Sequence, residues 1–242
     1  MFAKTRLALL VGWVTGSVAF PLLAQETTKN DTVVVTSQMQ SGATKLATPD
    51  IETPQSVSIV TREQFEEQGA TSVRQAVSYT PGVYSNQIGA SNRFDYIVLR
   101  GFSDGSLDNV YLDGLKMMGD TNSHSSLVVD PWFLEDIEVV RGPASVLYGR
   151  SSPGGIVALT SRKPSFDAGG EVKLFAGNNN QRGAAFDVTG ALDDNDRVAA
   201  RLSGMTRYAD SQFGPLKEER YALMPSLTWR ITDQTRLDLM AY

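Results

Sequence analysis

Cysteine is absent from all 242 residues, and histidine occurs once, at His124. Without cysteine the chain can build neither a disulfide framework nor a thiolate metal site. A single histidine and the lack of a paired-carboxylate pattern argue against hydrolytic catalysis, so we expect no enzyme. Acidic side chains outnumber basic ones by 27 to 22, and a clustered basic face is lacking, so we expect no nucleic-acid partner.

Long apolar runs are confined to the N-terminus, where residues 1–24 are predicted to be an export signal peptide. Two basic residues precede the apolar stretch 7–20, Pro21 breaks the helix, and Ala24 closes a small-residue cleavage site. The alternative is a transmembrane anchor, because the stretch is close to the minimum spanning length. After Ala24 no apolar run approaches roughly 18 residues, so further membrane contact would have to come from β-strands.

Residues 25–48 are mostly polar and are predicted to be a flexible tail that contains one β-branched segment. The β-branched run in residues 31–36 favours extended backbone but has no neighbouring strand in the sequence. Such a segment is suited to adding itself to the edge of another protein's sheet. The alternative is a first strand of the domain that follows.

Residues 49–165 have the pattern of a compact mixed α/β domain. Thr61 with Gln64, and Ser72 with Gln75, are predicted capping boxes that begin two helices. Asp113-Gly114 predicts a two-residue hairpin turn. Short strands are expected at 57–59, 97–99, 110–112, 115–117, 137–140 and 156–159, with a helical turn at 145–148.

Residues 168–242 alternate apolar with polar or charged side chains in about five segments of roughly ten residues. This dyad repeat is typical of strands in a transmembrane β-barrel, although a half-buried soluble sheet gives the same alternation. The strand length, the tyrosine and tryptophan residues and the export signal favour the membrane. Five strands cannot close a barrel, so we expect the chain to be a fragment of a longer protein.

Six short motifs follow one another along the chain. The longest is the block from Ile137 to Gly155. The others are Asp31-Thr32-Val33-Val34-Val35-Thr36, Thr53-Pro54-Gln55-Ser56-Val57, Tyr79-Thr80-Pro81-Gly82-Val83, Leu99-Arg100-Gly101-Phe102 and Tyr111-Leu112-Asp113-Gly114. Their order and spacing resemble those of TonB-dependent siderophore receptors along the whole chain, most closely the hydroxamate type (ferrichrome and ferrioxamine), and the block from Ile137 to Gly155 is the most specific.

The resemblance implies a mixed α/β plug domain, residues 49–165, followed by the first antiparallel strands, truncated here, of a transmembrane β-barrel of about 22 strands. It implies a location in the outer membrane of a Gram-negative bacterium, in contact with its lipid. It further implies active uptake of a ferric siderophore, energised by TonB and its inner-membrane complex. Because the siderophore itself coordinates the iron, the receptor needs no cofactor and no metal ligands of its own.

The resemblance also assigns roles to individual residues. The TonB box is Asp31, Thr32, Val33, Val34, Val35 and Thr36, and it would bind TonB by strand addition. The plug's outward loops would supply the siderophore contacts Ile88, Arg93, Gly105, Ser106, Met118, Asn122 and His124. Arg100 and Arg141, each directly before a glycine, would pair with glutamates on the barrel wall, because an unpaired guanidinium inside the lumen is unfavourable.

Four other functions remain to be weighed. Gly142 to Ser151 resembles a phosphate loop, but the glycine spacing is wrong and Arg150 stands where the pattern needs lysine. A haem or cobalamin receptor of the same fold is the main alternative, with His124 as a haem ligand. A passive barrel or adhesin would need neither the segment 31–36 nor a plug. A non-transporting, truncated remnant is the last possibility.

Overall fold

The computed structural model describes residues 39–40, 45, 48–49, 52–87, 89, 95–102, 109–117, 119–120, 125–211 and 217–242. All of these belong to one unit, Ser37–Tyr242. The predicted signal peptide 1–24, the predicted TonB box 31–36 and most of the tail lie outside the described residues. Within that part of the chain, no helix is both long enough and apolar enough to cross a membrane.

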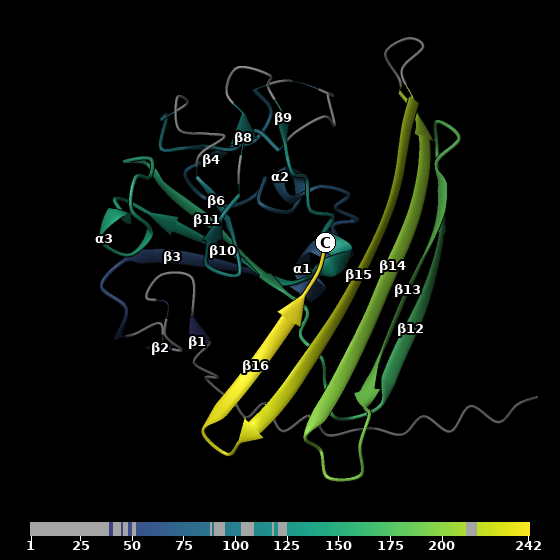
Figure 1. The fold of residues 1–242 in the computed structure, drawn as a ribbon. Helices are drawn as coiled ribbons and strands as arrows, with labels where there is room; N and C mark the ends of the chain where they lie inside the picture. Colours follow the sequence, from purple (N-terminus) through teal and green to yellow (C-terminus); the bar gives the residue numbers. More distant parts are fainter. Residues whose placement is uncertain are drawn as a thin grey trace, which may run out of the picture. The chain divides into compact units, whose positions relative to one another are not determined.

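A five-stranded mixed sheet forms the centre of the α/β domain (Figure 1). Its order is β3-β10-β11-β6-β7, and only β11 and β6 run parallel. Strand β10 is an interior strand and is mostly buried, since it pairs antiparallel with β3 on one side and β11 on the other. The strands are β3 Ser56–Thr61, β6 Val110–Leu112, β7 Leu115–Lys116, β10 Leu134–Arg141 and β11 Gly155–Ser161.

Two short helices follow β3 and begin at the predicted caps. Helix α1, Arg62–Glu67, has the full capping box of Thr61 and Gln64, and it buries Phe65 in the core. Helix α2, Val73–Ala76, is capped by Ser72, but its predicted reciprocal bond is wrong. The side chain of Gln75 instead accepts from the backbone and hydroxyl of Thr71, one residue earlier.

Turns place the remaining short elements. Asp113 and Gly114 both have positive φ, which confirms the predicted turn between β6 and β7. The 3-10 helix η2, Pro131–Phe133, precedes β10 in the chain, and helix α3, Ser145–Tyr148, follows it. Three further antiparallel pairs are β1 Met39–Gln40 with β2 Thr48–Pro49, β4 Val83–Tyr84 with β5 Val98–Leu99, and β8 Gly119–Asp120 with β9 Ser125–Ser126.

The core lies between the central sheet and the two helices. Ile97, Leu99, Leu134 and Ile137 are completely buried there. Close backbone approach explains the adjacent glycines Gly154 and Gly155. A Cβ on the first would lie 2.2 Å from the carbonyl oxygen of Leu99, and one on the second 2.1 Å from that of Val140. No larger residue fits at either position without displacing backbone.

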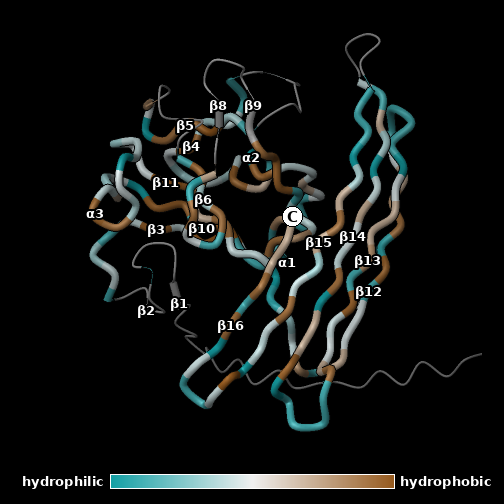
Figure 2. The backbone as a smooth tube through the Cα atoms, in the orientation of Figure 1, coloured by the Kyte–Doolittle hydropathy of each residue, from teal (hydrophilic) through white to brown (hydrophobic). Residues whose placement is uncertain are grey.

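A second sheet, here called the long sheet, consists of β12 to β16 in sequence order, all antiparallel. All five segments predicted after Pro164 form strands. One face carries exposed apolar side chains, among them Val172, Leu174 and Leu223, and Figure 2 shows apolar stretches along these strands. The strands are β12 Gly169–Ala176, β13 Arg182–Ala191, β14 Val198–Asp210, β15 Lys217–Thr232 and β16 Thr235–Met240.

Candidate functional site

The seven predicted siderophore contacts all lie outside the described residues: Ile88, Arg93, Gly105, Ser106, Met118, Asn122 and His124. Described residues that border these loops carry exposed apolar side chains. Tyr84 on β4, Phe102 after β5 and Leu127 after β9 are 57%, 47% and 58% exposed. The β4–β5 and β8–β9 pairs lie at the upper end of the α/β domain in Figure 2. Aromatic and apolar faces are thus available beside the predicted loops.

Arg100 and Arg141 lie close together where β5 and β10 end. Both side chains pass over Gly82, since a Cβ there would lie 3.7 Å from Cδ of Arg141 and 3.9 Å from Cγ of Arg100. Arg100 and Gly101 both have positive φ, and the backbone N–H of Arg100 donates to Gly82 at 2.9 Å. The backbone conformation of this turn therefore fixes the position of the Arg100 Cα and the direction in which its side chain leaves the chain.

Arg141 has neutral hydrogen-bond partners in the structure. Its Nε donates to the carbonyl of Pro81 at 2.8 Å, Nη1 donates to Ser56 at 2.9 Å, and Nη2 donates to the hydroxyl of Ser58. Burial, reinforced by the positive charge of Arg100, lowers the pKa of Arg141. Within the described ranges neither arginine pairs with a carboxylate, so the predicted pairing with barrel glutamates stays a prediction. Two adjacent guanidinium groups can together bind a carboxylate or another anion.

The α/β domain contacts the long sheet at η2. Asp130, the N-cap of η2, is only 3% exposed. Its Oδ1 accepts from the backbone N–H of Trp132 at 3.0 Å, and its Oδ2 accepts from Arg207 at 2.7 Å and Arg220 at 3.1 Å. These arginines come from β14 and β15, so one carboxylate joins two strands of the long sheet to the α/β domain.

Trp132 makes a second contact with the same sheet. Its indole Nε1 donates to the carbonyl of Phe186 on β13 at 3.3 Å. The guanidinium groups of Arg62 and Arg162 lie 5.2 and 6.0 Å from the Trp132 ring, within the range of cation–π attraction. Both arginines also form ion pairs with Glu171 on β12. The contact between domain and sheet is therefore polar as well as aromatic.

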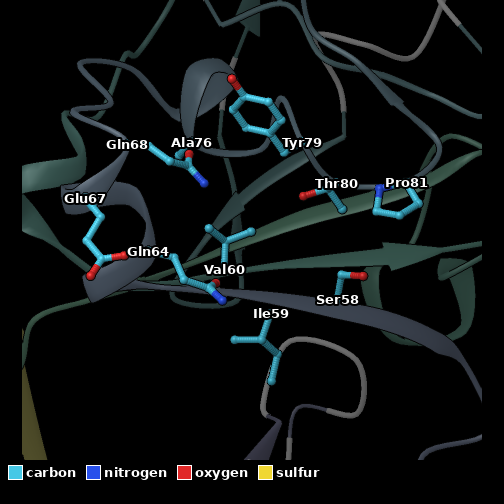
Figure 3. Close-up of a pocket in the computed structure, with 10 residues that line it drawn as sticks. All are labelled: Ser58, Ile59, Val60, Gln64, Glu67, Gln68, Ala76, Tyr79, Thr80 and Pro81. Carbon is cyan, nitrogen blue, oxygen red and sulfur yellow. The ribbon is translucent and has the colours of Figure 1, made fainter.

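A groove of about 460 Å³ runs along β3, an edge strand of the central sheet, beneath the exposed ring of Tyr79 (Figure 3). A cavity of about 240 Å³ lies between the α/β domain and the long sheet, beside Trp132 and Arg207. Among the described residues, no group of three or more acidic or histidine side chains could hold a metal ion.

Sequence patterns alone did not single out Asp130 or Trp132. Asp130-Pro131 is a recognisable helix start, with an aspartate cap and proline at the first helical position. This signal indicates a turn, but it does not reveal which charges lie opposite. The alternation placed Arg207 and Arg220 on the polar face of their strands, and the structure confirms that this face meets the α/β domain.

A family comparison matches residues 49–156 to the TonB-dependent Receptor Plug Domain. Those residues cover the central sheet through the start of β11, together with the helices and Arg100 and Arg141. Residues 49–156 are a TonB-dependent receptor plug domain. This match, together with the relatives below, confirms the family resemblance drawn from the motifs.

Relatives extend the similarity across the rest of the chain. The ferrioxamine B receptor of Salmonella typhimurium strain LT2 is 92% identical over all 242 residues, and the ferrioxamine receptor of Yersinia enterocolitica is 48% identical over 85% of the chain. The chain spans 34% and 29% of these relatives, respectively. The open form of the ferric-catecholate import receptor Fiu of Escherichia coli K12 superposes with a TM-score of 0.71 and 29% identity, over 84% of this chain and 29% of that structure.

These similarities confirm the predicted fold class, in which a plug domain is followed by the first antiparallel strands of a receptor barrel. The chain covers only 29% of the Fiu structure. The relatives are receptors by name, which confirms that the chain is not of an enzyme family. The boundaries proposed for the tail and for the plug's last residues stay predictions.

Proposed function

We propose that this chain is part of a TonB-dependent outer-membrane receptor that actively imports a ferric siderophore of the hydroxamate type. The observation that carries the proposal is a plug domain joined directly to antiparallel strands with an apolar outer face. The names of the ferrioxamine relatives support the hydroxamate class. Those names give no support to haem or cobalamin as the ligand.

An outer-membrane location follows from the long sheet. Side chains that alternate along its strands leave Val172, Leu202 and Leu223 on an exposed face, where water would be an unfavourable solvent. The opposite face carries Arg207, Asp187 and Ser203, which are buried. Lipid outside and a polar lumen inside are the environments that this arrangement fits.

Ligand recognition is assigned to the outward plug loops. The siderophore would meet Ile88, Arg93, Gly105, Ser106, Met118, Asn122 and His124, with Tyr84 and Phe102 adding aromatic surface at the base of the loops. An iron ion already coordinated by the siderophore needs only outer contacts, which are hydrogen bonds, aromatic faces and apolar groups. The barrel wall supplies the rest of the site.

Energy coupling is assigned to residues 31–36. An outer membrane has no energy source of its own, so force must be delivered from the inner membrane. The β-branched segment offers an extended strand that TonB can pair with, and pulling on it would move the plug. Arg100 and Arg141 would hold the plug to barrel glutamates until that force arrives.

Deletion of residues 31–36 from the full-length receptor tests the coupling step. Uptake of radiolabelled iron as ferrioxamine should fall to the level of cells without TonB, while equilibrium binding of ferrioxamine to the same cells stays unchanged. Deletion of residues 25–30, an equally long piece of the same tail, is the matched control and should leave both intact. Undiminished uptake after deletion of 31–36 would refute the assignment.

A further inference from the structure

The 3-10 helix η2 is one of the places where the plug domain is attached to the long sheet. Asp130 and Trp132 both bond across the boundary, to β14, β15 and β13. Buried side chains of the long sheet, Ala185, Met205 and Met224, join the plug's hydrophobic core in the same region. This part of the plug therefore rests on three neighbouring strands.

Asp130 divides its two oxygens between two tasks. Oδ1 caps the backbone of η2 through the N–H of Trp132, and Oδ2 alone accepts from both arginines. Arg207 is itself 8% exposed, and the same Nη1 also donates to the carbonyl of Thr71 at 3.0 Å. The cap depends only on an acceptor oxygen, whereas the attachment depends on negative charge.

Charge makes Asp130 the vulnerable member of this cluster. It faces two guanidinium groups, of which Arg220 has a second carboxylate partner, Glu218, at 3.4 Å. Removing one partner of a buried ion pair leaves the other charge buried without compensation, which is strongly destabilising. Neutralising Asp130 would also leave Arg207 and Arg220 close together with like charge.

A hollow of about 240 Å³ lies beside the cluster. Phe65 and Trp132 of the plug domain line it together with Phe175 and Met205 of the long sheet. Side chains make fewer apolar contacts where they face this space, so the ion pairs of Asp130 add to the attachment at this point.

We propose that Asp130 is a positioning residue that holds the resting plug against strands β14 and β15, and that its ion pairs break when the plug is displaced for import. The second part rests on the proposed transport function. The attachment itself is a property of the plug and the barrel wall, and it can be measured without any siderophore.

The test uses the full-length receptor in cells that lack TonB, so that nothing pulls on the plug. Asp130→Asn retains an acceptor for the η2 cap and removes the charge. The readout is sensitivity to vancomycin, a large antibiotic that an intact outer membrane excludes. We expect the inhibitory concentration to fall roughly tenfold at equal receptor abundance, because Arg207 loses its carboxylate partner and Arg220 keeps only Glu218. Asp136→Asn, which neutralises another plug carboxylate without an ion pair to the long sheet, is the matched control and should leave the sensitivity to vancomycin unchanged.

A second substitution separates the charge role from the cap. Adding Arg220→Gln to Asp130→Asn should restore part of the barrier, because it removes the like charge that then lies beside Arg207. A capping role alone predicts no restoration. If Asp130→Asn does not reach the surface, the double variant R207Q/R220Q with Asp130 intact should show the same leak. A normal barrier in whichever of these variants is at the surface overturns the proposal. If the wild-type receptor does not import ferric siderophore in cells that have TonB, the transport function is refuted, but the attachment of the plug through Asp130 is not.

Discussion

Individual charged residues in the plug domain owe their properties to burial. Asp136, at the start of β10, has one carboxylate oxygen buried without a hydrogen-bond partner. Burial, reinforced by the negative charges of Glu138, Glu135 and Asp113 and opposed by a hydrogen bond to Thr160, raises the pKa of Asp136 to about 6. Glu135, Asp136 and Glu138 are close in the sequence, whereas Asp113 comes near them only when the β6–β7 turn is assembled beside β10 and β11.

Asp136 should make plug stability depend on pH. Its pKa is raised from 3.8 to about 6 on folding, so the folded state holds the proton more tightly. The free energy of unfolding therefore falls as the pH rises from about 4 to about 6. Asp136→Asn removes the cost of burying the ionised carboxylate. It should raise the free energy of unfolding by about 1–2 kcal/mol at about pH 8, a value reduced for solvent screening because Asp136 is partly exposed. At about pH 4, where the carboxyl of the folded protein is protonated, the effect should be small.

Calorimetry of the full-length receptor at the two pH values measures this difference. Asp194→Asn, in an exposed turn of the long sheet, is the control and should leave the plug transition unchanged at both. A gain of equal size at both pH values would contradict the explanation, because it could not come from ionisation of the carboxyl.

Short elements in the plug depend on local capping. Helix α1 has only six residues, too few for a helix to be stable alone, so its start must be held by the reciprocal bonds of Thr61 and Gln64. Thr61 is also the last residue of β3, and the cap therefore fixes the angle at which the chain leaves the sheet. The position of Phe65 in the core follows from that angle.

Thr61→Ala should lower the free energy of unfolding of the plug by about 1 kcal/mol, because an orphan N–H of α1 loses its acceptor. Thr61→Ser retains the hydroxyl and should lose less than half of that amount. Chemical denaturation of both variants in the full-length receptor compares them directly. Equal losses would show that the methyl group of Thr61, rather than its hydroxyl, stabilises this corner.

At the scale of the whole molecule, the long sheet separates two environments. Its outer face is apolar and exposed, and its inner face buries charged and hydroxyl groups against the plug. Leu223 lies in the middle of β15, opposite Gly204, whereas Leu192 lies in the turn that follows β13. Both leucines are exposed, at 56% and 66%, but lipid would surround only the first at mid-depth.

Leu223→Arg should therefore impair insertion far more than Leu192→Arg. A cation at the middle of the lipid-facing surface costs about 2–4 kcal/mol, falling to about 0–1 kcal/mol near the interface. Folding of the full-length receptor into phospholipid vesicles, titrated with denaturant, measures both variants. Similar losses for the two would argue against a membrane around the long sheet.

Local sequence signals determined most elements of this protein. Alternation with period two placed all five strands of the long sheet, and cap and turn residues placed α1, the start of α2 and the β6–β7 turn, because these features depend on neighbours in the chain. The same signals gave the start of β10 too late, at Ile137 instead of Leu134, since a strand buried on both faces shows no alternation. Motif order indicated the family.

Only the tertiary structure decided which distant residues meet. Asp130 reaches Arg207 and Arg220 across 77 and 90 residues, and Arg141 reaches Ser56 across 85. Such contacts depend on strand order and on the fit of the plug against the long sheet, which no local pattern encodes. The sequence by itself determined that the plug and the strands would form, through turn chemistry and side-chain alternation. The tertiary structure decided that Asp130 would meet Arg207 and Arg220, because only folding brings these distant charges together and removes them from water.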